Sequence, residues 1–373
     1  MSFFIGVMSG TSLDGIDVAL VENNHNSDCT LIAAQTYEFD SVLKQGLKTL
    51  INEQQCELKT LGELDVALGK AIASAVIELI ATTDIKLNEI EAIGSHGQTI
   101  FHHPQGQHPF SLQIGNPSVI TELTGITTVA DFRQRDMVLS GQGAPLVPAF
   151  HKALFKQPER NRVILNIGGI SNITVLPARK SDKVIGFDTG PGNVLLDSWF
   201  EKHQHAPYDH DGLWAASGKI NPDLLRLMLN DDYFKLPIPK STGREYFNLS
   251  WLQAQLAVFQ AELAPQDIQA TLTALTAQSI TQDIKHYATK TNAIYVCGGG
   301  VHNSYLMRLL QQRAEVVVST TEEIGLHPDW VEASAFAWLA SQTISLKTGN
   351  LPDVTGATRA TILGGIYSSK EAS

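Results

Sequence analysis

One arrangement occurs twice in the chain: two apolar, β-branched stretches joined by a turn of small polar residues. The first copy runs from Phe3 to Leu20 around the turn SGTSLDG, and the second runs from Val163 to Leu176 as VILNIGGISNITVL. Apolar runs on either side of a glycine-rich turn predict a strand, a turn and a second strand. Because the unit recurs about 160 residues later, the repeat predicts two domains of similar fold.

Two more glycine-rich turns follow predicted strands. FDTGPGN (187–193) follows the strand KVIGF, and CGGGVHN (297–303) lies between the strand NAIYVC and a helix over SYLMRLLQQR. Ligands of open α/β sheets bind at the carboxyl ends of strands, where backbone amides and helix N-termini point at an anion. Each turn alone is more simply explained as a tight turn. Together, the four turns favour a nucleotide cleft between two similar domains.

The rest of the pattern alternates strands with helices, which is typical of α/β proteins. A third strand is predicted at 31–39. A long helix follows, with apolar residues three or four positions apart from Leu61 to Leu79. Further predicted elements are strands over EAIGSHGQTI (91–100), FSLQIG (110–115) and GITTVADF (125–132), and helices at 117–123 and 194–203.

Composition excludes several classes of protein. The chain has 373 residues, 43% of them hydrophobic, so it can bury a large core. With a net charge of −11 and no Lys/Arg cluster, no nucleic-acid partner is expected. Three cysteines without a CxxC pair indicate neither a disulfide framework nor a zinc site. No apolar run approaches the roughly 18 residues of a membrane span, so a cytoplasmic protein without membrane contact is expected.

The glycine turns do not match the common phosphate-binding motifs. The turn after Gly6 has no lysine where a P-loop requires one, and the three glycines from Gly298 do not give G-x-G-x-x-G. The turn SGTSLDG offers backbone N–H groups and two hydroxyls to phosphate oxygens, and Asp14 and Asp17 are spaced to hold Mg²⁺ through water. These features describe the phosphate loop of the sugar kinase, heat-shock 70 and actin superfamily.

Six motifs carry a closer resemblance. In chain order they are GVMSGTSLDGID, SHGQTIFH, ADFRQRDMVLSGQGAPLVP, FDTGPGN, KSTGREYFN and CGGGVHN. The set is similar to that of anhydro-N-acetylmuramic acid kinases, over nearly the whole chain from Phe3 to the closing TILGGIY. The resemblance implies an α/β fold of two similar ribonuclease H-like domains, with mixed sheets flanked by helices, in an actin-like ATPase architecture with a central cleft.

The same resemblance implies an activity. It implies a cytoplasmic, homodimeric enzyme of peptidoglycan recycling that uses ATP and Mg²⁺ to convert 1,6-anhydro-N-acetylmuramic acid and water into N-acetylmuramic acid 6-phosphate. Two alternatives remain open. One is a non-enzymatic nucleotide switch of the actin or heat-shock kind, and the other is a related enzyme with another acceptor, such as an acetate or glycerol kinase, or a phosphatase.

The implied reaction requires one strong base. A water must be activated to attack C1, while the γ-phosphoryl group captures O6 in place of the proton that an inverting glycosidase would donate. Asp188 in FDTGPGN is the predicted base, and the resemblance assigns it the same role. It follows a strand, where the chain bends through Gly190, Pro191 and Gly192, so its carboxylate would face the cleft. The alternative is that Asp188 caps the following helix.

The glycine turns are assigned to the nucleotide, because phosphoryl transfer depends mainly on positioning. Asp14 and Asp17 would also hold the metal, and for each glycine the alternative is a plain turn. The predicted residues are Gly10, Thr11, Ser12, Leu13, Asp14, Gly15, Ile16 and Asp17, then Gly168 and Gly169, Gly190 and Gly192, and, beside the adenosine as the resemblance implies, Gly298, Gly299 and Gly300.

An arginine is expected to pair with the lactyl carboxylate of the sugar. Arg133 is the leading candidate, because a planar guanidinium matches a carboxylate bidentately. Arg135 and Arg244 are the substitutes. For each arginine the alternative is a solvated surface ion pair.

Three more residues are predicted to bind the sugar. His96 and Gln98, in SHGQT, are candidates for its hydroxyls, although a structural histidine is nearly as good an explanation. Glu332 either binds the sugar or closes a capping box that starts at Asp329, or does both.

Domain boundaries are predicted from the position of the last strand and helix. In this architecture they often pack back on the first domain, so domain I is predicted at 1–129 plus 335–373 and domain II at 130–334. Closure of the two domains around the substrates would keep stray water from the γ-phosphate.

Overall fold

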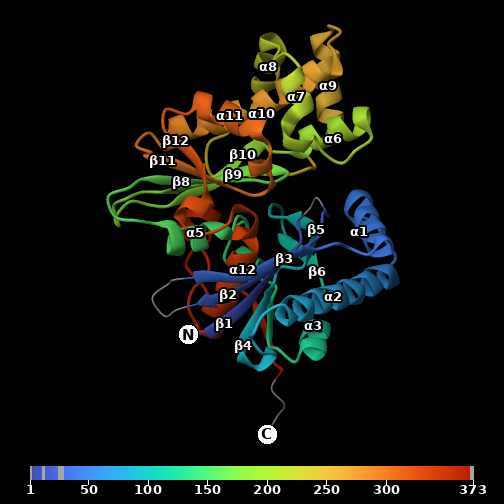
Figure 1. Cartoon of the computed structure of the whole chain (residues 1–373), viewed down its shortest axis with the longest axis vertical. Coiled ribbons are helices and arrows are strands. Elements are labelled where there is room, and N and C mark those ends of the chain that lie inside the picture. The colour runs from blue at the N-terminus through green and yellow to red at the C-terminus, as the bar shows by residue number, and fades with distance from the viewer. Residues whose placement is uncertain (1, 11–12, 24–28, 370–373) are drawn as a thin grey trace. The chain divides into compact units, whose positions relative to one another are not determined.

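The computed structural model describes residues 2–10, 13–23 and 29–369. Its internal contacts divide the chain into two compact units, Met1–Leu154 with Trp330–Ser373 and Phe155–Asp329 (Figure 1). The C-terminal segment therefore belongs to the same unit as the N-terminal strands. The boundaries expected from the sequence, 1–129 with 335–373 and 130–334, lie at other residues and stay a prediction.

A six-stranded mixed sheet forms the centre of the first unit. Its strand order is β13-β7-β4-β1-β2-β3. Antiparallel pairs join β1 to β2 and β2 to β3, whereas β4 is parallel to β1 and β7 is parallel to β4. The strands are β1 Ser2–Met8, β2 Ile16–Asn23, β3 Cys29–Tyr37, β4 Ile90–Ser95, β7 Thr128–Ala130 and, antiparallel at the edge, β13 Gly365–Tyr367.

The second unit repeats this arrangement in a five-stranded sheet of order β10-β9-β8-β11-β12. Antiparallel pairs again join the first three strands, and two parallel strands follow. The strands are β8 Arg162–Ile167, β9 Ile170–Leu176, β10 Ile185–Pro191, β11 Ala293–Cys297 and β12 Val317–Thr320. Apart from the edge strand β13, which has no counterpart in the second sheet, the two units share one strand order and one set of strand directions, so the predicted fold class of two similar domains with mixed sheets is confirmed.

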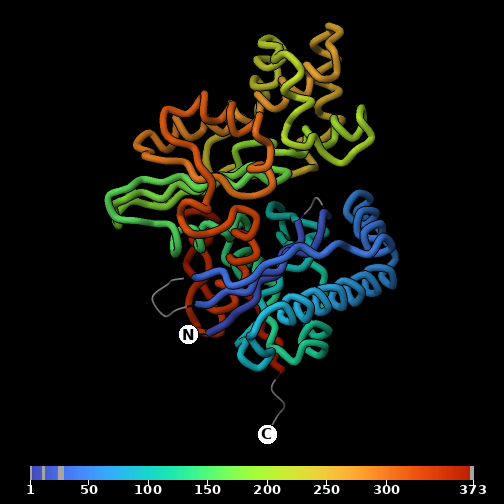
Figure 2. The backbone as a smooth tube through the Cα atoms, in the orientation of Figure 1, coloured from blue at the N-terminus to red at the C-terminus, as the bar shows by residue number. Residues whose placement is uncertain are grey.

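Helices cover both faces of the first sheet. On one face, Ile5 and Val7 of β1 pack in a core cluster with Leu68 and Ile72 of the long helix α2, Leu58–Ala81. On the other face lies α12, Val331–Ile344. Because side chains alternate along a strand, Gly6 points at α12, and its lack of a side chain lets the helix backbone approach the sheet closely. Figure 2 shows the N-terminal strands beside this C-terminal helix.

One large core organises the second unit. Val163, Leu165 and Ile167 of β8 pack with Leu272 and Ile280 of the helix α10. The helices of this unit are α6 Val194–Gln204, α7 Leu213–Ser217, α8 Pro222–Leu229, α9 Leu249–Phe259, α10 Pro265–Tyr287 and α11 Ser304–Arg313.

Shorter elements complete the first unit. A two-stranded sheet pairs β5 with β6. Within the described residues, no helix is long and apolar enough to cross a membrane. The remaining elements are α1 Ser41–Glu53, β5 Gln98–His103, β6 Phe110–Ile114, α3 Pro117–Thr124, α4 Gln134–Val138, α5 Val147–Phe155 and α13 Pro352–Thr355.

Two predicted strands have other limits in the structure. The segment 91–100 is not one strand, because Gly97 adopts φ +67° and the chain turns between β4 and β5. The strand predicted to end at Phe187 instead runs on to Pro191, through a shift of register between Asp188 and Gly190. Asp188 therefore lies within β10 and not in a turn after it.

Candidate active site

The turn between β1 and β2 is supported by buried polar groups. The Ser9 hydroxyl donates to Gln98 Oε1 at 2.5 Å, and both side chains are buried. Leu13 has φ 57° and its N–H donates to the Gly10 carbonyl at 3.2 Å, so the chain turns tightly here. The predicted phosphate ligands Thr11 and Ser12 lie outside the described residues.

The second half of this turn carries the two candidate metal ligands. Asp14 is exposed, and Gly15 packs against Thr36. Ile16 and Asp17 already belong to β2, where the Asp17 carboxylate accepts a hydrogen bond from Thr36 Oγ1 at 2.6 Å. Nowhere in the described ranges do three or more His, Cys, Asp or Glu side chains form a group that could hold a metal. The residues present fit an ion held by one or two carboxylates, water and phosphate oxygens, which is how Mg²⁺ is usually bound.

Two of the glycine turns in the second unit are hydrogen-bonded to each other. Gly192 N–H and Val194 N–H donate to the Gly169 carbonyl at 2.9 and 3.0 Å, and Asn193 N–H donates to the Gly168 carbonyl at 2.9 Å. A Cβ on Gly192 would overlap the Gly168 carbonyl oxygen, so the close approach requires glycine there.

The third glycine turn of this unit lies against the same residues. A Cβ on Gly298 would overlap Asn166 Oδ1, and one on Gly300 would overlap the side chain of Ile167. A Cβ on Gly299 would lie 3.9 Å from Asn193 Nδ2. The structure thus brings the turns at 168–169, 192–193 and 298–300 together, at the carboxyl ends of β8 and β11. Gly190 differs, since its φ of +134° turns it toward Phe234 and Ser279.

The Asp188 carboxylate is half-buried in β10 and is held at one oxygen. Thr242 N–H donates to Asp188 Oδ2 at 3.0 Å, and the backbone of Asp188 is fixed by Tyr233 Oη, which donates to its carbonyl at 2.7 Å. The pKa of the Asp188 carboxyl is raised to about 7, chiefly by burial; the Thr242 N–H lowers it, the charge of Glu245 raises it and the Lys240 ammonium lowers it. A carboxyl of this kind can exchange a proton near neutral pH.

The alternative role of Asp188 as a helix cap is wrong. The helix after the turn, α6, begins after Asn193 and has no side-chain cap hydrogen bond. Asp188 lies five residues before that cap, inside a strand, so its carboxylate is not used to satisfy the helix terminus.

In the first unit, the half-buried Arg133 pairs with the buried His96. Arg133 Nε and Nη2 lie 3.2 and 2.8 Å from His96 Nε2, and Arg133 Nη1 donates to the Gly143 carbonyl at 2.7 Å. Since a guanidinium can only donate, His96 Nε2 accepts, and its Nδ1 donates to the Gly97 carbonyl at 2.9 Å. Burial holds the pKa of His96 well below its usual range and the Arg133 charge adds to this, against the Gly97 hydrogen bond, so the imidazole is neutral.

Arg133 keeps its charge in this setting. Burial lowers its pKa to about 10, while the carboxylates of Glu332 and Asp136 raise it. A guanidinium has five N–H groups, and the bonds to His96 and Gly143 occupy three of them. Two donors remain beyond these bonds, which is the number that a carboxylate accepts from an arginine.

Of the other two predicted sugar ligands, Glu332 lies near Arg133 and Gln98 lies near Ser9. Glu332 is in the first turn of α12, and its negative charge raises the pKa of Arg133. The capping box expected at Asp329 is wrong, because α12 begins after Trp330 and has no side-chain cap hydrogen bond. Gln98 is fully buried, and its amide donates to the Thr99 carbonyl at 3.3 Å while it accepts from Ser9.

The two substitute arginines belong to different units. Arg135 is exposed on α4. Arg244 belongs to the second unit, where its Nε and Nη2 lie 3.7 Å from the position that a Cβ on Gly169 would take. Within the first unit, Arg133 is thus the arginine that contacts His96 and is influenced by Glu332, and Arg135 is not.

Comparison with known proteins shows the family of this chain. A model of the anhydro-N-acetylmuramic acid kinase family matches residues 2–369. The chain belongs to this family. It is 49% identical over 365 residues to the anhydro-N-acetylmuramic acid kinase of Coxiella burnetii (strain Dugway 5J108-111), covering 98% of this chain and 97% of the relative. It is 50% identical over 368 residues to that of Pasteurella multocida (strain Pm70), covering 98% and 96%.

Similarities to solved structures are weaker. The activator of the 2-hydroxyisocaproyl-CoA dehydratase from Clostridium difficile with bound ADPNP has a TM-score of 0.44 and 12% identity, over 90% of this chain and 92% of that chain. A ROK family glucokinase from Streptomyces griseus has a TM-score of 0.41 and 12% identity, over 90% and 99%. Similarities of this size do not indicate a shared activity.

Sequence reasoning misses several residues of this anhydro-N-acetylmuramic acid kinase family member. Lys240, Thr242 and Glu245 surround Asp188 from the motif KSTGREYFN, in which only Arg244 is assigned a role from the sequence. The buried Asp136 accepts from Gly143 N–H at 2.9 Å and so fixes the loop that receives Arg133. The family motifs themselves are the available signal, because all of these residues lie inside them.

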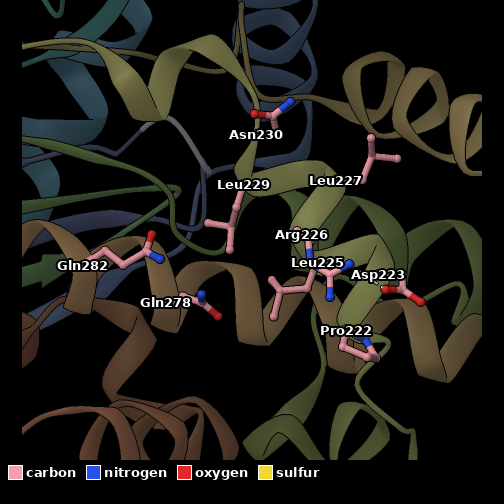
Figure 3. Close-up of a pocket in the computed structure, with 9 residues that line it drawn as sticks. All are labelled: Pro222, Asp223, Leu225, Arg226, Leu227, Leu229, Asn230, Gln278 and Gln282. Atoms are coloured by element: carbon pink, nitrogen blue, oxygen red, sulfur yellow. Dashed lines mark hydrogen bonds and ion pairs between the residues drawn. The ribbon is translucent and has the colours of Figure 1, made fainter.

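A cavity of 760 Å³ in this family member involves none of the predicted residues. It lies between α8 and α10 (Figure 3). Leu225 and Leu229 come from α8, and Gln278 and Gln282 come from α10. A second cavity of 340 Å³ is lined by Asp283 and His286, among others. Neither includes a residue predicted to bind nucleotide or sugar.

Proposed function

We propose that this protein is an ATP-dependent kinase that opens the 1,6-anhydro ring of 1,6-anhydro-N-acetylmuramic acid with water and phosphorylates O6. The products are N-acetylmuramic acid 6-phosphate and ADP, so the activity serves peptidoglycan recycling and amino-sugar breakdown. One observation carries the proposal: the anhydro-N-acetylmuramic acid kinase family matches the chain from residue 2 to 369.

Asp188 is the proposed base. Thr242 N–H binds Oδ2, and we assign Oδ1 to the attacking water. With a pKa of about 7, close to half of the carboxyl is ionised at neutral pH and ready to accept a proton. As the water oxygen bonds to C1, its proton passes to Asp188 and the C1–O6 bond breaks. O6 then takes the γ-phosphoryl group, ADP leaves, and Asp188 returns the proton to solvent.

The glycine turns are the proposed phosphate ligands. Backbone N–H groups near the start of a helix favour an anion, and glycine lets an oxygen approach the backbone closely. Residues 10–17 of the first unit and the turns at 168–169, 192 and 298–300 of the second are assigned to ATP. Mg²⁺, proposed to bind Asp14 and Asp17 through water, would neutralise charge on the β- and γ-phosphates.

The cluster of Arg133, His96 and Glu332 in the first unit is the proposed sugar site. Arg133 is assigned to the lactyl carboxylate through the two N–H groups that His96 and Gly143 leave over. Neutral His96 orients the guanidinium, and Glu332 is assigned to sugar hydroxyls. Gln98 is assigned to the sugar as well, although its amide already bonds to Ser9 and Thr99.

A homodimer in the cytoplasm completes the proposal. Relatives of this family named above share nearly the whole length of the chain, which supports a common assembly. Light scattering coupled to size-exclusion chromatography would measure the mass in solution. A mass of one 40.6 kDa chain at micromolar concentration would contradict the dimer.

The proposed activity is tested by measuring ADP release with and without 1,6-anhydro-N-acetylmuramic acid, with the phosphorylated sugar identified by mass spectrometry. ADP release that depends on this sugar supports the proposal. Slow ATP hydrolysis that ignores the sugar would indicate a nucleotide switch. A response to acetate or glycerol instead would indicate a kinase with another acceptor.

The proposed base is tested by Asp188→Asn. This change should lower sugar phosphorylation by roughly 10²–10⁴-fold, the usual contribution of a general base, while ATP binding measured by calorimetry stays nearly intact. Asp223→Asn is the matched control, because Asp223 is an exposed aspartate of the same unit that pairs with Arg226 at 2.9 Å. It should keep full activity. Wild-type turnover in Asp188→Asn would refute the assignment.

A further inference from the structure

A buried ion pair lies next to Asp188. Lys240 Nζ is 3.0 Å from Asp283 Oδ2, and the two side chains are only 2% and 13% exposed. The Lys240 ammonium also lies over two aromatic rings, 5.8 Å from the centroid of Phe187 and 5.1 Å from that of Tyr233. Carboxylate and rings together hold the ammonium in one place.

Lys240 and Tyr233 also make hydrogen bonds to the backbone of Asp188. Asp188 N–H donates to the Lys240 carbonyl at 3.1 Å, and two residues later Thr242 N–H reaches the Asp188 carboxylate. Tyr233, whose ring lies under the ammonium, donates its hydroxyl to the Asp188 carbonyl. The cation, its ring partners and the carboxylate therefore form one connected group.

Fold stability alone is a weak reason for a lysine at this position. Burying two charges is costly, and replacing such a pair with apolar side chains of similar size is often neutral or stabilising. A positive charge beside a half-buried carboxylate has another use, because it favours the ionised form that acts as a base.

We propose that Lys240, held in place by Asp283, is a positioning residue for Asp188: its backbone segment orients the carboxylate, and its buried ammonium favours the ionised form that acts as the base. This rests on the proposed function, in which Asp188 activates water. Lys240 touches no reacting atom, and its effect passes through Asp188.

The other charged groups near Asp188 define what the test must separate. Glu245, on the same segment as Lys240, raises the pKa of Asp188, and Lys240 lowers it. Burial raises the pKa of Asp283, while Lys240 and, from α10, His286 lower it. Tyr233 faces Asp188 with a pKa raised by burial and by the charges of Asp188 and Asp283, so it stays neutral. Lys240 is thus the cation whose removal should act on Asp188 most directly.

The test removes the charge in two ways. Lys240→Met leaves Asp283 without its cation and can harm folding. Lys240→Met/Asp283→Leu replaces the whole pair with apolar side chains and is expected to fold. Lys235→Met is the matched control, because Lys235 is a lysine of the same unit whose pair with Asp232 is 54% and 94% exposed.

Kinetics give the first measurement, as kcat/KM for sugar phosphorylation from pH 5 to 9. The Lys240 charge acts on Asp188 less than burial and the other neighbouring groups do, so its loss should move the acidic limb of the profile up by about 0.5 pH unit. At pH 7 this lowers the ionised fraction of Asp188 from a half to about a quarter, so the rate falls about twofold and recovers toward pH 9. In Lys235→Met, the acidic limb of the kcat/KM profile should lie at the same pH as in the wild type. A merely structural lesion would lower the rate equally at every pH, and an unchanged limb or a uniform loss would overturn the proposal.

A second measurement does not depend on activity. The effect of Asp188→Asn on the free energy of unfolding reports the pKa of Asp188 through its pH dependence. This effect is measured by adding Asp188→Asn to the wild type and to the double variant, and its midpoint should also move up by about 0.5 pH unit in the double variant. If Asp188→Asn proves active, the base assignment fails whatever this midpoint does. If it is inactive and neither limb nor midpoint moves, only the role of Lys240 fails.

Discussion

Asp188→Asn should stabilise the fold in the same pH range in which it removes the proposed activity. The carboxyl has its pKa raised from the usual 3.8 to about 7, chiefly by burial. The folded protein therefore binds this proton more tightly than the unfolded chain does. As the pH rises above about 4, the carboxyl of residue 188 ionises in the unfolded chain before it ionises in the folded protein. The free energy of unfolding of the wild type therefore falls up to about pH 7 and stays constant above it. The amide of the Asp188→Asn variant does not ionise, so it adds no such pH dependence.

The size of the effect follows from the difference between the two pKa values. At 1.36 kcal/mol for each pKa unit, a rise from 3.8 to about 7 corresponds to at most about 4 kcal/mol. Because the carboxylate is half-buried, solvent screens part of this, and we expect roughly 2–4 kcal/mol at pH 8.5. The amide oxygen of asparagine can still accept the Thr242 N–H, so the local hydrogen bond is kept.

The assay is urea unfolding of both proteins at pH 4, 5.5, 7 and 8.5, followed by circular dichroism. The gap in unfolding free energy should be near zero at pH 4, open between pH 4 and 7, and stay constant above that. Asp223→Asn, an exposed change, should show no such gap. A variant that is equally or less stable at pH 8.5, or a gap independent of pH, would refute the reasoning.

Three further changes test the packing and the two proposed ligand sites. Gly94→Ala would place a methyl group on the Phe336 carbonyl of α12 and should lower the free energy of unfolding by roughly 2 kcal/mol or more in denaturant unfolding. Gly62→Ala is the control: a Cβ there has nothing within 4 Å, so the change should raise the free energy of unfolding by about 1 kcal/mol. Equal effects of the two changes would contradict the close packing. Arg133→Lys cannot serve His96, Gly143 and a carboxylate together, so KM for the sugar should rise about tenfold while KM for ATP stays constant in steady-state assays. Gly192→Ala would push apart the turns at 168–169 and 192–193 and should raise KM for ATP about tenfold; an unchanged value would remove these turns from the nucleotide site.

Local patterns in the sequence predict most of the fold. The two hairpins are read from short apolar runs around small-residue turns, and both occur, as β1–β2 and β8–β9. The three-and-four spacing from Leu61 to Leu79 lies within α2, and the helix predicted over 304–313 has those limits in α11. These elements are set by residues close together in the chain, which is why the sequence alone is enough.

Features that depend on distant residues cannot be predicted in this way. Between Ile93 and Ile100 the segment 91–100 contains only small and polar residues with two glycines, and nothing local marks Gly97 rather than Gly94 as the point where φ becomes positive. Asp188 is recognised as a candidate from its motif, but the groups that tune it come from Tyr233, Lys240 and Thr242, some 45 to 54 residues later. Their approach depends on how the second unit packs, and no spacing in the sequence records it.

The close packing of α12 on β1 and β4 has a consequence for biosynthesis. Gly6 and Gly94, which are paired in neighbouring strands, let the helix at 331–344 approach the sheet closely. Because this helix is synthesised late, one face of the sheet stays uncovered until almost the entire polypeptide has left the ribosome. At about 5–20 residues per second, this is a wait of many seconds. The middle segment, 155–329, contains all of its own strands and can fold before synthesis of the chain ends. The first unit therefore begins to be translated first and is the last to complete its fold.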